Sequence, residues 1–144
     1  MKIVYLFMMI AAGCCAGIQS SVNTLLGKQI GVFEGGFVSF IGGTIIFGLL
    51  VAFFGKGNLA SITQIPYWQL IGGLLGAYFV ASVIISVPNI GVASVMVGAI
   101  LGQLIIAILI DHFGWFNVVA TPISFYRIIG VIFVLTGVLC IFKR

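Results

Sequence analysis

Five apolar stretches separated by short polar segments fill almost the whole 144-residue chain. Each stretch is close to the ~20 residues that a helix needs to cross ~30 Å of hydrocarbon. Backbone groups in lipid must be paired within helices or closed barrels, and the alternating polarity of a membrane barrel is absent. The pattern therefore predicts an all-α integral membrane protein of one domain, residues 1–144, with five spans: Ile3–Leu26, Val32–Phe54, Tyr67–Val87, Ile90–Ile110 and Phe125–Phe142.

The composition excludes several function classes. Hydrophobic residues make up 62% of the chain and charged residues 6%, against roughly 25% charged in soluble domains. The longest segments outside the spans, Gly55–Pro66 and Asp111–Ser124, are too short to hold a catalytic domain. The three cysteines lie inside spans, without metal-ligand spacing. We therefore expect no enzyme, no cofactor and no metal, and no nucleic-acid partner because the basic residues are scattered.

The first span has one alternative interpretation. Lys2 precedes an apolar run that reaches Ala-Ala-Gly-Cys14, which loosely resembles the cleavage site of a lipoprotein signal. The apolar run continues past Cys14 to Leu26, which is longer than the apolar part of a signal peptide. This length favours a membrane span.

The basic residues give the chain no preferred orientation. Five crossings put the termini on opposite sides, here called side A (the N-terminal side) and side B. Three basic residues fall on each side: Lys2, Lys56 and Arg127 on side A, and Lys28, Lys143 and Arg144 on side B. The positive-inside rule then has no bias to act on. We expect insertion in both orientations and pairing as an antiparallel homodimer; pairing with an inversely oriented paralogue and a single fixed orientation are the alternatives.

Small residues recur at helical spacing in three spans. The rows are Gly35, Ser39 and Gly43; Gly72 and Gly76; and Gly91, Ser94, Gly98 and Gly102. Such rows allow close helix packing in lipid, and hinge bending is the alternative role. The short connection from Pro88 to Gly91 predicts that the third and fourth helices form an antiparallel hairpin, with the third helix ending before Pro88.

Polar side chains within spans are the candidates for a solute path. Gln19 and Asn23 share one face of the first helix, and Ser39 lies at the same depth as Gln19. With Gln103 and the midspan Tyr78, they form the candidate path. Most polar groups fall in the side B half, which predicts a water-accessible vestibule that opens toward side B. The alternative is that the carboxamides only join helices, and that the ring of Tyr78 is a core aromatic.

The few charged residues have two interpretations each. Glu34 could couple transport to protons, because a partly desolvated carboxylate can accept one near neutral pH, or it could stabilise the first turn of its helix. A Glu34→Gln variant with unchanged pH dependence of transport would exclude the coupling role. Asp111 and His112 end the fourth helix near Arg127, which predicts a structural ion pair between helix ends in preference to a catalytic dyad.

Particular strings go beyond this pattern. They are Ala16-Gly17-Ile18-Gln19-Ser20-Ser21-Val22-Asn23 with Leu26-Gly27, Val38-Ser39-Phe40, Gly42-Gly43-Thr44, Trp68 before Gly72-Gly73-Leu74-Leu75-Gly76, Gly102-Gln103-Leu104, Asp111-His112-Phe113-Gly114, Arg127 and Gly130. Together they resemble the YdcZ family of the drug/metabolite transporter superfamily. The resemblance implies a five-helix half of a ten-helix, inverted-repeat transporter in the bacterial inner membrane, completed by dimerisation. Related small multidrug exporters use a glutamate in their first helix, where this chain has Gln19 and Asn23.

We therefore expect a transporter of small solutes that works by alternating access as a dimer of inversely oriented units. The alternative is a non-transporting membrane scaffold or accessory subunit. The two differ in the response to Gln19→Leu combined with Asn23→Leu, which a scaffold would tolerate. A transporter should lose flux in that variant and keep its assembly.

Overall fold

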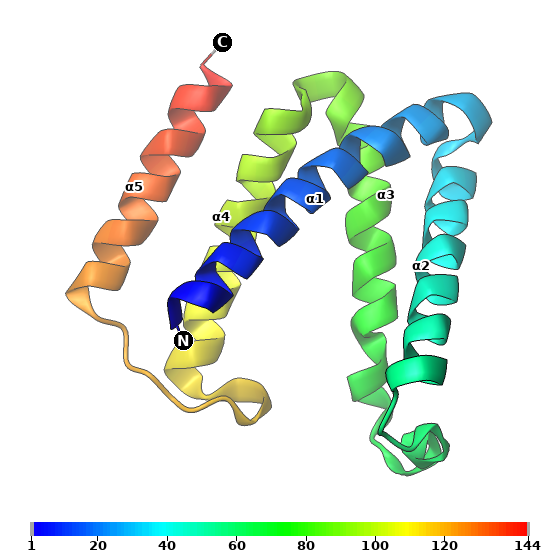
Figure 1. Ribbon diagram of the computed structural model, residues 1–144. Coiled ribbons are helices and arrows are strands. Elements are labelled where there is room, and N and C mark those ends of the chain that lie inside the picture. The colour runs from blue at the N-terminus through cyan, green and yellow to red at the C-terminus, as the bar shows by residue number, and fades with distance from the viewer. Residues whose placement is uncertain (1, 144) are drawn as a thin grey trace. The chain divides into compact units, whose positions relative to one another are not determined.

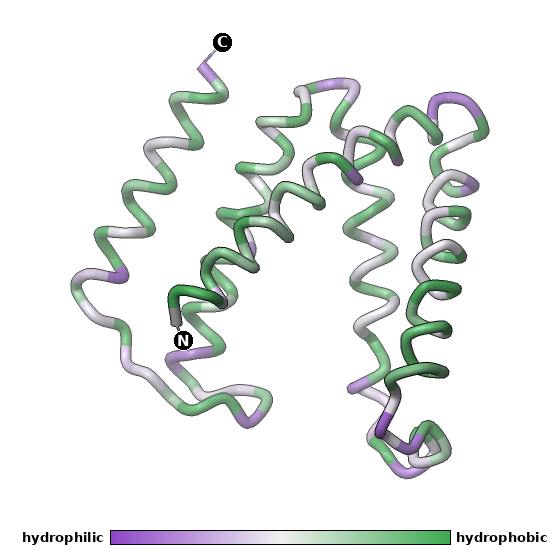
Figure 2. The backbone as a smooth tube through the Cα atoms, viewed as in Figure 1, coloured by the Kyte–Doolittle hydropathy of each residue, from purple (hydrophilic) through white to green (hydrophobic). Residues whose placement is uncertain are grey.

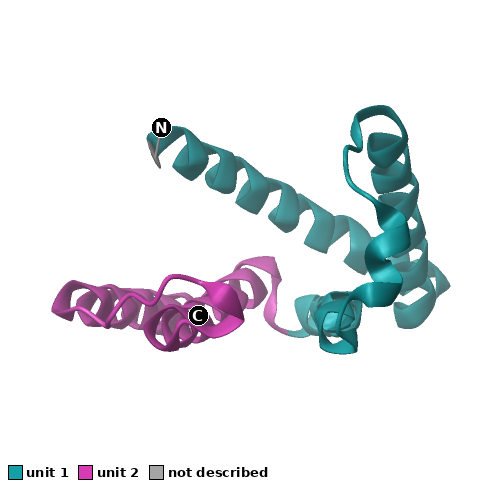
Figure 3. Cartoon of the chain, turned by 90° about the horizontal axis from the view of Figure 1, so that it is seen from below, with its two compact units in different colours: residues 1–89 teal, residues 90–144 magenta. Residues whose placement is uncertain are grey.

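The computed structural model describes residues 2–143, without the side chain of Lys2. Arg144 and the side chain of Lys2, two of the six basic groups counted above, lie outside the described residues. The chain divides into two compact units, residues 1–89 (unit 1) and residues 90–144 (unit 2), which we describe separately (Figure 3). The organisation as a single domain stays a prediction.

All regular elements in the described range are helical (Figure 1), and five helices are long and apolar enough to span a membrane. The predicted five-span helical membrane protein is thereby confirmed. In chain order the elements are α1 (Lys2–Ile30), α2 (Val32–Phe54), the 3₁₀ helices η1 (Leu59–Gln64) and η2 (Tyr67–Ile71), α3 (Gly72–Ile90), α4 (Val92–Phe113), the 3₁₀ helix η3 (Trp115–Asn117) and α5 (Phe125–Phe142).

Helix α1 ends later than the sequence predicted, at Ile30 instead of Leu26. The apolar run stops at Leu26, but the helical hydrogen bonds continue until Gly31, whose φ of 111° is open only to glycine at low cost. The N–H of Gly31 donates to the carbonyl of Gly27 at 3.0 Å. Lys28 in the last turn suits the negative end of the helix dipole. A backbone dihedral therefore decides this boundary.

Helix α3 also differs from its predicted range of Tyr67–Val87. Its first five residues form the 3₁₀ helix η2, and the α-helix continues through Pro88 to Ile90. Pro88 cannot donate to the carbonyl of Ile84, yet Asn89 Nδ2 donates to the carbonyl of Ile85 at 2.7 Å and helps to hold this last turn. The chain turns at Gly91, with φ of 81°. The prediction that the helix ends before Pro88 was wrong.

The core of unit 1 is a junction of α1, α2 and α3. Gly27 of α1 and Gly35 of α2 are both buried, and a Cβ built on Gly35 would lie 3.0 Å from the Cα and the N of Gly27. A Cβ on Gly27 would lie 2.5 Å from Cγ2 of Ile84 in α3. Glycine at both positions permits this approach of two backbones without a shift of either helix. The packing role predicted for Gly35 agrees with this contact.

Away from that junction, α1 diverges from α2 and α3. Residues 3–16 of α1 are all exposed within the described structure, and the two views of unit 1 show α1 leaning away from the other two helices (Figures 1 and 3). The helices α2 and α3 run antiparallel and are joined by the segment of residues 55–71, which contains η1 and η2 (Figure 1). Unit 1 is therefore a wedge, closed at Gly27 and Gly35.

Unit 2 contains α4, η3 and α5. Helix α4 covers Val92–Phe113, shifted from the predicted Ile90–Ile110, because glycines with positive φ set both ends: Gly91 at the start and Gly114, with φ of 65°, after Phe113. The bounds of α5 agree with the prediction. A Cβ on Gly98 or Gly102 of α4 would meet no atom within 4 Å in this unit, so these two glycines of the row pack against nothing there.

Most apolar side chains face outward. Val83, Ile84 and Val138 are the buried hydrophobic residues of the described part of the chain. Hydrophobic positions run along the helices and polar ones gather at the turns (Figure 2). A surface of this kind would aggregate in water and suits lipid or a protein partner.

Candidate functional site

A cavity of about 610 Å³ lies inside the wedge of unit 1. It is bounded by α1, α2 and α3 and by the start of η1. Its lining residues are Gln19, Ser39, Phe40, Gly43, Thr44, Phe47, Gly48, Val51, Leu59 and Val80. This volume lies within the range of ligand pockets that hold drug-sized molecules.

The cavity exists because α2 carries glycines where α1 has already diverged. A Cβ on Gly43 or Gly48 would meet no atom within 4 Å, so these glycines leave space and are not needed for packing in this unit. The predicted row of small residues on α2 therefore has two roles. Gly35 brings the backbones together, whereas Gly43 belongs to the cavity.

Three polar side chains line the cavity, and none of its described lining residues is charged. The carboxamide of Gln19 and the hydroxyl of Ser39 can each donate and accept a hydrogen bond. The hydroxyl of Thr44 donates to the carbonyl of Phe40 at 2.8 Å, so its proton is already used. The cavity thus presents a few uncharged polar groups within a mostly apolar wall.

The cavity extends toward side A, whereas the vestibule expected from the sequence opens toward side B and stays a prediction. Its wall follows α2 from Ser39 to Val51 and then reaches Leu59 in the side A connection. A second cavity of about 520 Å³ shares Val51 and Leu59 and adds Gly55, Gly57 and Asn58. At the side B end, α1 and α2 converge, and the side chains of Ser20, Asn23 and Thr24 on α1 are buried there.

Asn23 belongs to that packed region. It is 6% exposed and does not line the cavity. Ser20 and Thr24, which the sequence reasoning missed, are buried beside it. Thr24 Oγ1 donates to the carbonyl of Ser20 at 2.8 Å, whereas Ser20 Oγ has no hydrogen-bond partner among the described residues. With Gly27 these positions form an i, i+3, i+4, i+7 stripe, a signal that could have identified the buried face of α1.

Tyr78 and Gln103 lie outside this cavity. The side chain of Tyr78 on α3 is 76% exposed. Gln103 is exposed on α4, in unit 2. The structure brings together Gln19 and Ser39 from the predicted path. The participation of Asn23, Tyr78 and Gln103 stays a prediction.

Glu34 stands in the first turn of α2, exposed and outside the cavity. Its carboxylate lies directly over Gly31, where it would contact any Cβ added to that glycine. The position close to the free N–H groups of α2 suits a carboxylate that stabilises the helix N-terminus. This geometry favours the structural interpretation of Glu34 over proton coupling.

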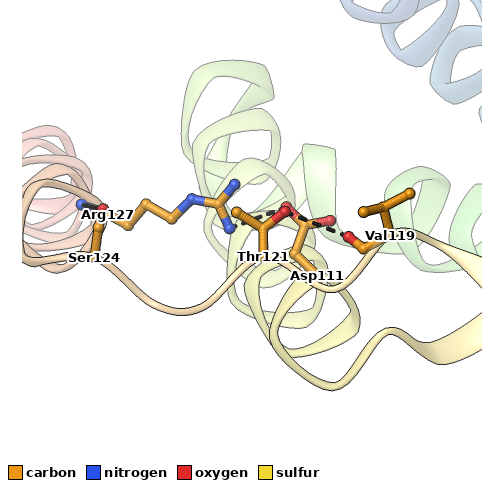
Figure 4. A network of polar contacts seen from close by, with 5 residues as sticks. All are labelled: Asp111, Val119, Thr121, Ser124 and Arg127. Carbon is orange, nitrogen blue, oxygen red and sulfur yellow. Dashed lines mark hydrogen bonds and ion pairs between the residues drawn. The ribbon is translucent and has the colours of Figure 1, made fainter.

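In unit 2, Asp111 and Arg127 form an ion pair between α4 and α5 (Figure 4). Arg127 Nη1 lies 3.1 Å from Asp111 Oδ2, and both side chains are about one third exposed, 33% and 37%. The N–H of Thr121 donates to the carbonyl of Asp111 at 2.7 Å. Ser124 caps α5 by accepting from the N–H of Arg127 at 3.3 Å. His112 is exposed, and its ring centroid lies 4.9 Å from that of Phe113 in a T-shaped arrangement.

The family model described as "Putative inner membrane exporter, YdcZ" matches residues 4–140. No curated protein and no solved structure matches the chain.

Proposed function

Because the chain belongs to the YdcZ family, a family of membrane exporters by description, we propose that it carries small solutes across the inner membrane through the cavity of unit 1. The observation that carries this proposal is the cavity of about 610 Å³ between helices of membrane-spanning length, with the polar side chains of Gln19, Ser39 and Thr44 in an otherwise apolar lining. A packed scaffold has no need for Gly43 and Gly48 to leave this space open.

The working unit in this proposal is a pair of inversely oriented chains. The wedge is open along the exposed half of α1, residues 3–16, so unit 1 by itself does not close the path. The equal number of basic residues on the two sides favours insertion in both orientations. An inverted second copy, or an inversely oriented paralogue, would supply the missing wall, and rocking of the two halves would alternate access.

Topology tests the pairing. A reporter fused after Arg144 should be active on both sides of the membrane if the chain pairs with itself in inverted orientation. A signal on one side alone would contradict the homodimer and favour an inversely oriented paralogue.

Transport is tested with two neighbouring glycines of α2. Gly43→Leu places a side chain in the cavity, whereas Gly42→Leu adds the same side chain at a position that does not line it. Solutes released into the medium by cells that express each variant are compared by mass spectrometry. We expect Gly43→Leu to abolish the release seen with the native chain, and Gly42→Leu to retain it. Identical profiles for the native chain and Gly43→Leu, with equal amounts in the membrane, would contradict transport and favour a scaffold.

A further inference from the structure

The residues that line the cavity in unit 1 indicate whether its solute is charged. The described lining residues include no acid and no base. Glu34 and Lys28, charged residues near the α1–α2 turn, are outside the lining. A charge moved from water into such a site would lose its hydration without gaining a partner. This disfavours both anions and cations as solutes.

Two weaker sources of charge stabilisation do not change this conclusion. Phe40 and Phe47 are aromatic lining residues, but a cation–π contact would offset only part of the desolvation of an ion. Anions are bound by free N–H groups at helix N-termini. The cavity follows the middle and the C-terminal half of α2, from Ser39 to Val51, where the helix dipole offers no such positive end.

The polar groups select a head group that is uncharged and forms hydrogen bonds. Gln19 and Ser39 each provide a donor and an acceptor. Thr44 can only accept, since its proton is held by the carbonyl of Phe40. An amide or a hydroxyl group matches this set, because such groups donate and accept without carrying a charge.

The apolar wall selects the remainder of the molecule. From Ser39 to Val51 the lining follows α2 for about 18 Å, at ~1.5 Å per residue. The polar pair Gln19 and Ser39 lies at one end of this distance, and Val51 with Leu59 lies at the other. The cavity therefore suits an elongated solute, with its head group beside Gln19 and its apolar body directed toward side A.

We infer that the transported solute is an uncharged amphipathic molecule with an amide or hydroxyl head group and an apolar body. This inference rests on the transport function proposed above.

Three probes that share an apolar phenylalkyl body and differ in the charge of the head group test the inference: phenylbutyramide, phenylbutyrate and phenylbutyltrimethylammonium. Their binding to the purified full-length chain in phospholipid nanodiscs is measured by equilibrium dialysis. The amide should bind at least tenfold more tightly than either charged probe. Gln19→Leu should remove that preference while retaining weak binding of the apolar body, and Ser21→Ala, an exposed neighbour outside the cavity, serves as the control.

Two glycine variants test whether the probes bind in this cavity. Gly43→Leu should weaken binding of the amide at least tenfold, and Gly42→Leu should not. Size-exclusion chromatography verifies that each variant elutes as the native chain does. A charged probe that binds as tightly as the amide, or an amide whose binding is unaffected by Gly43→Leu, would overturn the inference, as would the absence of amide binding.

The same probes, loaded into proteoliposomes, separate this inference from the function on which it rests. Selective binding of the amide without its transport would contradict the proposed function while leaving the binding preference intact. Transport of a charged probe that Gly43→Leu blocks would support the function and overturn the solute class.

Discussion

Replacing Gly35 with alanine tests the junction from which α1 and α2 diverge. The added Cβ would lie 3.0 Å from both the Cα and the N of Gly27 and 3.5 Å from the carbonyl carbon of Leu26. Carbon atoms pack best at ~3.5–4.0 Å. The atoms in the way belong to backbone and cannot rotate aside, so α1 must retreat from α2.

The size of the effect follows from two opposing terms. Overpacking of this kind costs ~1–3 kcal/mol, and alanine recovers up to ~1 kcal/mol of helix propensity relative to glycine. We expect Gly35→Ala to lower the free energy of unfolding by ~1–2 kcal/mol, which is roughly a 5- to 30-fold change in the folding equilibrium.

The neighbouring glycine provides the control. A Cβ on Gly36 would lie 3.8 Å from Cγ1 of Val80, an ordinary contact, and the change in helix propensity is the same. Unfolding of both variants is measured by far-UV circular dichroism in micelles with increasing SDS. The proposed close contact of Gly27 and Gly35 is refuted if Gly35→Ala is as stable as Gly36→Ala.

Two further substitutions examine buried and half-buried polar groups. Ser20→Ala should leave the free energy of unfolding unchanged or raise it in the same SDS titration. The reason is that Ser20 Oγ is buried without a partner in the described chain, so its removal leaves no other polar group unpaired. A decrease of more than ~1 kcal/mol in the free energy of unfolding would show that the hydroxyl has a hydrogen-bond partner. Asp111→Asn should cost at most ~1 kcal/mol, because the ion pair with Arg127 is partly exposed to solvent. A double-mutant cycle with Arg127→Gln measures this coupling, which should shrink in high salt; a coupling that salt does not change would contradict a solvated pair.

The five spans could be predicted from sequence because the bilayer thickness fixes the length of an apolar helix. Their ends could not be predicted equally well. Hydropathy stops at Leu26, whereas α1 continues to Ile30, and α3 continues through Pro88. In both cases the helix ends just before a glycine with positive φ, Gly31 or Gly91. Hydropathy predicts where the chain leaves the apolar part of the bilayer, whereas the backbone dihedral angles determine where a helix ends.

The candidate site was predicted in part. Counting residues placed Gln19 and Ser39 at one depth, and they line one cavity. The same counting put Asn23 on the face of Gln19, yet Asn23 is buried at the helix junction. The spacing of small residues predicted a packing role for Gly43, although a Cβ there would meet no atom within 4 Å.

Sequence periodicity determined which residues share a face and how deep each lies, because both follow from the rise and the turn of a single helix. It could not determine which neighbour covers that face. This depends on where two backbones touch and how far they diverge beyond the contact, here at Gly27 and Gly35. The tertiary structure alone therefore decided that Asn23 is buried near side B and that the cavity beside Gln19 extends toward side A.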